Sequence, residues 1–199
     1  MLSGTAADLY AVWAQAGAIL AVGSGGVLSR WNGSSFASAA LPAAAGRTLR
    51  AVWGSAPASA WLAGDGGMML RWNGIAAAAV SVGSTIDLFG LWGSSASDVW
   101  AVGDGGRIFH YDGSSWSLHV QGSSLTTQSL RAITGRNAKD VFCAGDQGAL
   151  LRYDGTNWTK VDSGSVAGLT ALWATGVGEV IIAGQAATIL RYIPQNPQL

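Results

Sequence analysis

The chain has 199 residues, 49% of them hydrophobic and 11% charged, and its eleven basic and eleven acidic side chains cancel. This balance gives no electrostatic footprint for nucleic acid, so nucleic-acid binding is excluded. No apolar run of 18 residues is present, which excludes a membrane-spanning helix. The start of the sequence has neither a basic nor an apolar region, so no secretory signal is expected there.

The clearest unit of the sequence covers residues 88–118. Four short apolar runs, 88–92, 98–103, 107–111 and 115–118, are separated by clusters of Gly, Asp and Ser, a pattern typical of β-strands. Asp112-Gly113 between the last two runs predicts a two-residue type I′ hairpin, because that turn needs positive φ at both central residues. The unit is therefore predicted to be a four-stranded antiparallel meander.

The same unit recurs five times. Its first-strand motif, Leu-x-(Ala/Gly)-aliphatic-Trp, begins at Leu9, Leu49, Leu88, Leu130 and Leu169, with Thr134 in place of the tryptophan in the fourth copy. A second-strand glycine and an Asn-Gly or Asp-Gly pair keep the same phase, with Ile193-Pro194 at that place in the fifth copy. A period of about 40 residues with about four strands per unit is the signature of a β-propeller.

The sequence therefore predicts an all-β, five-bladed β-propeller forming a single domain over residues 1–199. The repeats cover approximately 9–48, 49–87, 88–129, 130–168 and 169–193. The fifth copy has three strands of its own, and residues 1–7 are a candidate for a short fourth strand that would close the ring. The other interpretation is that the five copies are part of a larger ring. An unpaired edge on the last blade also predicts possible self-association.

The repeat lines AVGSGGVLSRWNGSSF, AVGDGGRIFHYDGSSW and AGDQGALLRYDGTNW resemble bacterial tandem-repeat propellers of the Asp-box (BNR-like) and photosystem-assembly-factor-like kind, found in myxobacterial surface proteins. The resemblance covers Leu9 to Tyr192 and implies a propeller fold and an extracellular or cell-envelope location. The Asp-box places its tryptophan five residues after the aspartate, whereas Asp112 and Trp116 are four apart. The catalytic residues of sialidases that carry this repeat have no matching positions here.

Most of the conspicuous side chains are predicted to be structural. The ten tryptophans fall on repeated positions, which favours packing between blades over sugar stacking. The third-strand cations are expected near the rim, where they pair and stack locally; they are Arg30, Arg71, His110, Arg152 and Arg191. Cys143 lies in an apolar run and is expected to be buried. No cofactor motif, metal-ligand spacing or nucleophile with a base is present, so an enzyme is not predicted.

One position varies while its neighbours stay nearly constant, and it supplies the candidate site. The second residue of the first strand is Tyr10, Arg50, Phe89, Arg131 and Thr170 in successive copies. The first strand is expected to line the central channel, with its start beside the turn between strands two and three. That turn carries the aspartates Asp65, Asp104 and Asp146. The ligand-binding candidates are therefore Tyr10, Arg50, Phe89, Arg131, Asp65, Asp104 and Asp146.

These observations favour a non-catalytic recognition module. The preferred hypothesis is a protein-binding scaffold whose partner contacts the channel mouth, because an irregular set of side chains suits one asymmetric partner. A carbohydrate-binding, lectin-like propeller is the alternative, and a glycan-active hydrolase is a distant third.

Overall fold

The computed structural model describes residues 4–120, 124–175 and 178–193, and the described chain forms five antiparallel sheets. The first two are β1 (Leu9–Gln15), β2 (Ala18–Gly23), β3 (Val27–Trp31), β4 (Phe36–Ala40), and β5 (Leu49–Ala56), β6 (Ser59–Gly64), β7 (Met69–Trp72), β8 (Ala77–Ala79). The third is β9 (Leu88–Ser95), β10 (Asp98–Gly103), β11 (Ile108–Tyr111), β12 (Trp116–Val120).

The fourth sheet is β13 (Leu130–Asn137), β14 (Asp140–Gly145), β15 (Leu150–Tyr153), β16 (Trp158–Lys160), and the fifth is β17 (Leu169–Ala174), β18 (Val180–Gly184), β19 (Ile189–Tyr192). In every sheet each strand pairs with the next one along the chain, so each predicted repeat is one meander. Short 3₁₀ turns are η1 (Ser24–Gly26), η2 (Pro42–Ala44), η3 (Asp65–Gly67), η4 (Asp104–Gly106) and η6 (Asp146–Gly148).

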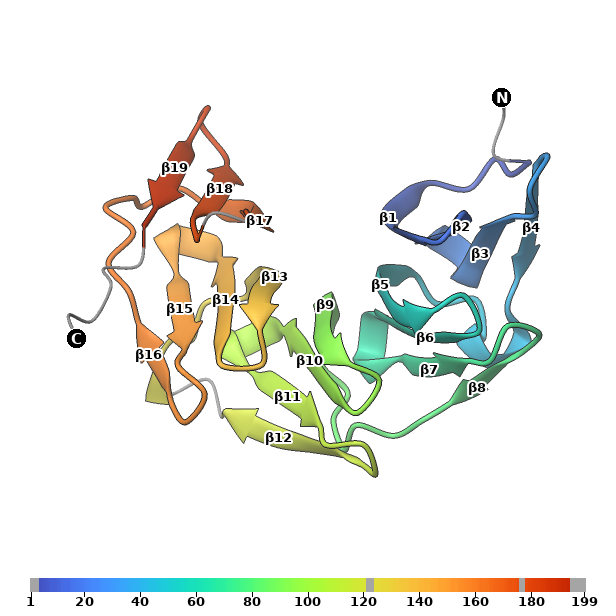
Figure 1. Ribbon diagram of the computed structural model, residues 1–199, viewed down its shortest axis with the longest axis horizontal. Coiled ribbons are helices and arrows are strands. Elements are labelled where there is room, and N and C mark those ends of the chain that lie inside the picture. Colours follow the sequence, from blue (N-terminus) through green and yellow to red (C-terminus); the bar gives the residue numbers. More distant parts are fainter. Residues whose placement is uncertain (1–3, 121–123, 176–177, 194–199) are drawn as a thin grey trace.

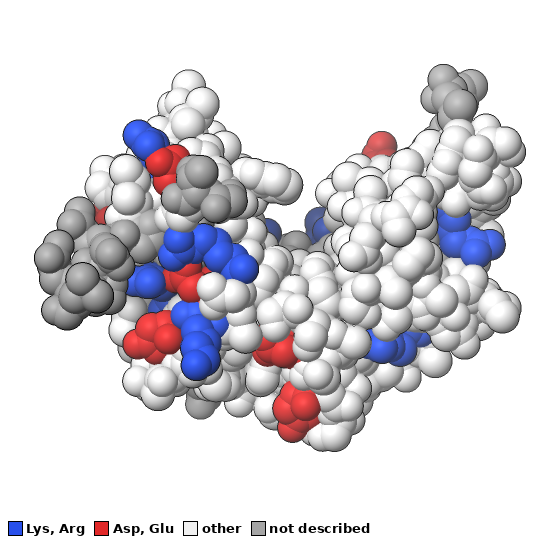
Figure 2. All heavy atoms as spheres, viewed as in Figure 1, with Lys and Arg blue, Asp and Glu red and all other residues white. Residues whose placement is uncertain are grey.

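The sheets follow one another around an arc. The first strands β1, β5, β9, β13 and β17 line its inside, and β4, β8, β12 and β16 lie on its outside (Figure 1). This arrangement agrees with the predicted placement of the first strands. An opening separates the first sheet from the fifth, so the structure does not show the predicted closure into a ring. The opening remains when all side chains are drawn (Figure 2).

The repeated glycine at the end of each second strand is required because the neighbouring backbone leaves no room for a side chain. Its φ lies near −165°, which is ordinary extended backbone. A Cβ on Gly64 or Gly145, however, would overlap the carbonyl oxygen of Thr48 or Ser129, the residue before the first-strand motif of the same copy. The close approach lets Asp65 N donate to Thr48 O at 3.0 Å and Asp146 N donate to Ser129 O at 2.9 Å. The glycine thus locks the turn onto the start of the inner strand.

The hairpin between the third and fourth strands differs from the two-residue type I′ turn predicted. Tyr111 pairs with Trp116, so four residues form the loop. The Asp112 carboxylate accepts hydrogen bonds from the backbone N–H of Ser114 (2.8 Å) and Ser115 (3.0 Å), and Gly113 has φ +98°. The loop is an Asx-capped turn in which the aspartate side chain, rather than a second positive φ, closes the chain.

Each pair of adjacent sheets shares an apolar core. In the first-strand motif the aliphatic residue packs on the preceding sheet, so Val52, Leu91 and Ile133 are only 8%, 8% and 9% exposed. The tryptophan packs on the following sheet, where the ring of Trp13, Trp53 or Trp92 lies against a glycine of the next first strand. Those glycines are Gly54, Gly93 and Gly135. Alternate residues of one strand therefore join the blades on both sides.

The prediction that the repeated tryptophans pack between blades is confirmed for most copies. The side chains of Trp61, Trp72, Trp100, Trp116 and Trp158 are buried, and those of Trp13, Trp53 and Trp92 are half-buried. Trp173 in the fifth sheet is 71% exposed, which the repeat pattern alone does not predict. Its exposure follows from its place at the end of the arc, where no further sheet covers it.

The proposed closing strand at residues 1–7 is contradicted for the part that the structure describes. Residues 1–3 lie outside the described residues. Gly4 lies beside β4 of the first sheet, where an added Cβ would be 3.2 Å from Phe36 O. The fifth sheet has the three strands β17, β18 and β19. The Pro194 part of the fifth hairpin position also lies outside the described residues.

Candidate functional site

Four of the seven candidate side chains form one row along the inside of the arc. The Arg50 guanidinium lies between two rings, with its carbon 5.9 Å from the centre of Tyr10 and 5.7 Å from that of Phe89. The Arg131 guanidinium carbon also lies over the Phe89 ring, 4.3 Å from its centre. The row therefore alternates aromatic ring and cation across four sheets, an arrangement stabilised by attraction between the charge and the ring face.

Both arginines of this row are held by an aspartate of their own sheet. Arg131 donates from Nε and Nη2 to the two carboxylate oxygens of Asp146, at 3.0 and 2.7 Å. Arg50 makes the same two-point contact with Asp65. These hydrogen bonds raise the pKa of both guanidiniums above the ordinary value, against an opposing effect of burial. The fork of each arginine is thus fixed in direction, and Nη1 is not used in the contact with the carboxylate.

The remaining aspartates link neighbouring sheets. Asp104, whose sheet has Phe89 in place of an arginine, accepts a hydrogen bond from Ser129 Oγ at 2.7 Å. Asp87 accepts one from Gly66 N at 2.8 Å, and its charge acts on both Arg50 and Arg131. Sequence reasoning missed Asp87, although it directly precedes the first-strand motif of the third copy. The structure thus brings the predicted site residues together, with Arg50 and Arg131 each paired with an aspartate.

We call this set the inner row: Tyr10, Arg50, Phe89, Arg131, and the aspartates Asp65, Asp87, Asp104 and Asp146. Tyr10 is 51% exposed, while the two arginine side chains are 35% and 36% exposed. These groups offer an open wall with aromatic faces and partly accessible guanidiniums. Its chemical capacity is recognition of planar or anionic groups through stacking and hydrogen bonding. That it binds a ligand stays a prediction.

The third-strand cations behave as predicted. Arg30 lies over the Trp72 ring at 5.1 Å and Arg71 over the Trp61 ring at 4.6 Å. His110 stacks on Trp100 at 4.0 Å, and its Nε2 is 2.6 Å from Asp98 Oδ1. Arg152 and Arg191 pair with acids of their own sheets. Each group is used locally, so these residues form no common site.

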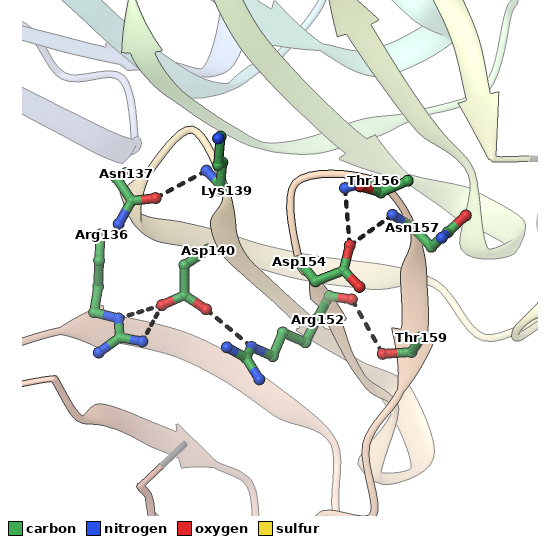
Figure 3. A network of polar contacts seen from close by, with 9 residues as sticks. All are labelled: Arg136, Asn137, Lys139, Asp140, Arg152, Asp154, Thr156, Asn157 and Thr159. Carbon is green, nitrogen blue, oxygen red and sulfur yellow. Dashed lines mark hydrogen bonds and ion pairs between the residues drawn. The ribbon is translucent and has the colours of Figure 1, made fainter. Parts of the chain in front are cut away.

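A second polar cluster lies at the opposite end of the inner strands, and sequence reasoning missed it. Asp140 is buried and accepts hydrogen bonds from Arg152 Nε at 2.9 Å and from Arg136 (Figure 3). With Lys139 they border a cavity of about 620 Å³ between the fourth and fifth sheets. Lys and Arg gather over the fourth sheet in Figure 2, whereas most of that face is uncharged.

The sequence carried a signal for this cluster. Arg136 directly follows Gly135, the glycine under the Trp92 ring, and the second and third copies have Ser55 and Ser94 at the equivalent place. All three side chains bond to the residue four positions on, at Ser59, Asp98 and Asp140 respectively. The arginine is therefore a substitution within a repeated contact, and its first role is to neutralise the buried Asp140 carboxylate.

Within residues 4–120, 124–175 and 178–193, no group of three or more His, Cys, Asp and Glu side chains is arranged to hold a metal ion. Cys143 is fully buried, and its burial raises the pKa of the thiol well above the ordinary value, as expected for a packing residue. Among the helices of the described residues, none has the length and apolar character needed to cross a membrane.

Similar solved structures show which fold the five sheets form. One chain of YCF48 bound to D1 peptide is 17% identical, with a TM-score of 0.72, and is matched over 97% of this chain and 66% of that chain. YCF48 from Cyanidioschyzon merolae is 14% identical, with a TM-score of 0.74, covering 98% of this chain and 72% of that chain. These neighbours are β-propeller proteins, so the five sheets are propeller blades.

A third similar structure is an enzyme. Virginiamycin B lyase from Staphylococcus aureus is 13% identical, with a TM-score of 0.73, covering 98% of this chain and 73% of that chain. Because scaffolds and a lyase share the fold, the fold alone does not decide between binding and catalysis. No protein-family model and no curated protein matches the sequence. The chain spans about two thirds of the length of the YCF48 chain that is bound to peptide.

Proposed function

We propose that this chain is a non-catalytic protein-binding scaffold that holds a segment of its partner on the inner row. The alternation of Tyr10, Arg50, Phe89 and Arg131 carries the proposal. These residues occupy a first-strand position that varies in size and charge between copies. The leucine before it is buried in the last four copies, at Leu49, Leu88, Leu130 and Leu169. A side chain that is not needed for packing between blades is available for contacts outside the chain.

The chemistry of the row favours a polypeptide partner. Guanidiniums held by Asp65 and Asp146 have their remaining N–H groups in fixed directions, which suits carbonyl and carboxylate acceptors. The exposed Tyr10 ring offers an apolar surface beside them. A peptide supplies acceptors and apolar side chains at this spacing. The similar YCF48 structure with D1 peptide supports a protein partner for this fold.

The test uses the double variant Arg50→Ala with Arg131→Ala. A partner is first found by affinity capture or on a peptide array, and its Kd is then measured for the variant. We expect binding to weaken by about 10-fold or more, because removal of groups at the centre of an interface typically costs over 1 kcal/mol for each group. A melting temperature close to that of the parent would show that the fold is retained.

The matched control is Arg30→Ala with Arg71→Ala. It removes the same charge and two cation–ring contacts, but at the rim. We expect its Kd to equal that of the parent. Equal losses in both double variants, or loss only on Arg136→Ala, would contradict a site on the inner row.

A glycan is the alternative ligand, favoured by the exposed Tyr10 ring, since aromatic faces stack on sugars. A glycan array with the parent chain separates the two: saturable binding that disappears on Tyr10→Ala would overturn the protein-scaffold proposal.

We also propose an extracellular or cell-envelope location, supported by the low charge and the Gly-rich and Trp-rich composition. Recovery of the native product only in the cytosolic fraction would contradict it.

A further inference from the structure

The two ends of the arc expose residues that the repeat buries elsewhere. At the aliphatic position of the first strand, Val12 is 67% exposed, whereas Val52 and Leu91 are each 8% exposed. At the tryptophan position, Trp173 is 71% exposed, whereas Trp53 and its equivalents are half-buried. The first blade thus lacks a blade before it, and the fifth blade lacks a blade after it.

Packing at the first three of the four junctions between blades shows what would cover the exposed Trp173. Trp13, Trp53 and Trp92 rest on Gly54, Gly93 and Gly135 so closely that an added Cβ would lie 3.0, 2.7 and 2.6 Å from the ring. Real Cβ atoms essentially never come closer than 3.0 Å, so Gly93 and Gly135 must be glycine, and the 3.0 Å contact at Gly54 is tighter than most Cβ contacts. We call this place on the next first strand the receiving position. The covering surface for Trp173 is therefore a first strand with glycine at this position.

The fourth junction shows the complementary pattern. The fourth blade has Thr134 at the tryptophan position, and the receiving position of the fifth blade is Ala174. The smaller Thr134 side chain thus stands opposite a receiving residue, Ala174, that has a Cβ. The first blade has Ala14 as its receiver. By the same steric rule, Ala14 accepts a small residue such as threonine and does not accept a tryptophan.

This mismatch excludes the chain's own first blade as the cover for Trp173. Direct closure of five blades, or docking of a second copy head to tail, would place Trp173 on Ala14 and force a Cβ into the indole ring. Whatever fills the opening must therefore place a glycine against the Trp173 ring and a small residue against Ala14.

We propose that the opening between β17 and β1 is the docking site of two further blades of this same repeat, on a continuation of the array. The first has glycine at the receiving position, and the second has a small residue at the tryptophan position. The number two agrees with the similar propellers, since this chain covers 72% and 73% of two of them. The remaining quarter corresponds to about two repeats of about 40 residues.

The test is a fusion in which residues 73–160 are repeated directly after Tyr192. This insert supplies a copy of the third blade, with Gly93 to receive Trp173, and a copy of the fourth, with Thr134 to face Ala14. Hydroxyl-radical labelling with mass spectrometry measures the exposure of Trp173 and Val12, neither of which is duplicated. We expect labelling of Trp173 to fall to the level of Trp53, and that of Val12 to the level of Val52.

The matched control is the same fusion with Gly93→Leu in the inserted copy only. The leucine side chain occupies the space into which the Trp173 ring would pack, so Trp173 should keep the labelling level of the parent chain. Peptides from the duplicated blades must retain their parental protection in both fusions, which reports that the insert has folded.

Two results would overturn the proposal. One is a folded fusion in which Trp173 and Val12 label as strongly as in the parent. The other is a parent chain in which both residues are already protected and become exposed only on dilution, because that result makes a second copy the occupant.

Discussion

The three central blades and the two terminal blades carry the same motif in different surroundings. In the central blades the aliphatic and tryptophan positions of each first strand are covered from both sides, and the inner strand joins two cores. In the terminal blades one of the two positions faces the opening: Val12 in the first blade and Trp173 in the fifth. The same residue type is therefore part of the core in one blade and surface in another.

This difference shows that a repeated residue does not have one fixed energetic value. Burial of apolar area stabilises by about 25 cal/mol per Å² removed from water, so the contribution depends on the neighbouring blade and not on the motif. The central junctions should dominate the stability of the chain, as nearest-neighbour contacts do in repeat proteins. Substitutions at equivalent positions test this.

The largest expected difference is between Val52→Asp and Val12→Asp. Val52 is buried between the first and second blades, where a carboxylate has no partner, and an unpaired charge there should cost more than about 4 kcal/mol. Val12 faces the opening, so its substitution should change stability by about 0.5 kcal/mol or less. Denaturant unfolding measures both. Equal losses would show that the first blade is covered in solution.

The tryptophan position gives the next largest effect. Trp92 is half-buried on Gly135, and Trp92→Ala should cost about 2–4 kcal/mol through lost packing. Trp173→Ala should cost about 0.5 kcal/mol or less because the ring is exposed. The melting temperature should fall clearly in the first variant only. A comparable fall in both would break the distinction between central and terminal blades.

A smaller effect is expected at the receiving position. Gly135→Ala brings a Cβ to 2.6 Å from the Trp92 ring and should cost about 1–3 kcal/mol through overpacking. Adding Trp92→Ala removes the ring and should relieve most of that strain, so the two effects will not be additive. A double-mutant cycle by chemical denaturation measures the coupling. Additive losses would mean that the ring and the glycine do not constrain each other.

The smallest effect distinguishes the Asp hairpins of the third and fourth blades from the Asn hairpins of the first two. Backbone hydrogen bonds from Ser115 and Ser114, with one from the Ser114 hydroxyl, lower the pKa of Asp112 from 3.8 to about 2, and similar bonds lower that of Asp154. A depressed folded-state pKa stabilises the fold above pH 3.8, and this contribution is lost as the pH falls through about 2.

The double variant Asp112→Asn with Asp154→Asn keeps the turn, as Asn32 and Asn73 do in the first two blades. It should therefore lose less stability than the parent between pH 4 and pH 2. Thermal melting across this range measures the difference. Identical pH profiles would show that the two hairpin types are equivalent in acid.

The repeat made much of this fold predictable. Phase-locked motifs at Leu9, Leu49, Leu88, Leu130 and Leu169 predicted five sheets, strand order and the inner position of the first strands, because each copy repeats one local problem. The predicted hairpin type was wrong, because an aspartate before glycine suits both a type I′ turn and an Asx-capped loop. The register of Tyr111 and Trp116 selects the latter.

The candidate site shows the same division. Variation at one first-strand position predicted Tyr10, Arg50, Phe89 and Arg131, and these do form one row. The sequence did not reveal that Asp65 and Asp146 each hold an arginine, or that Asp87 acts on both. Such pairings depend on distances across strands and between blades, which have no fixed spacing along the chain.

The sequence by itself determined the local units, since hydrogen bonding within a meander, Asx-capped hairpins and close glycine approaches all act within one repeat of about 40 residues. Only the tertiary structure decided which copies of a motif are core and which are surface. That outcome depends on how far the arc turns and on whether a neighbouring blade is present. Trp53 and Trp173 have the same motif, and only the arrangement of the blades makes one a packing residue and the other an exposed ring.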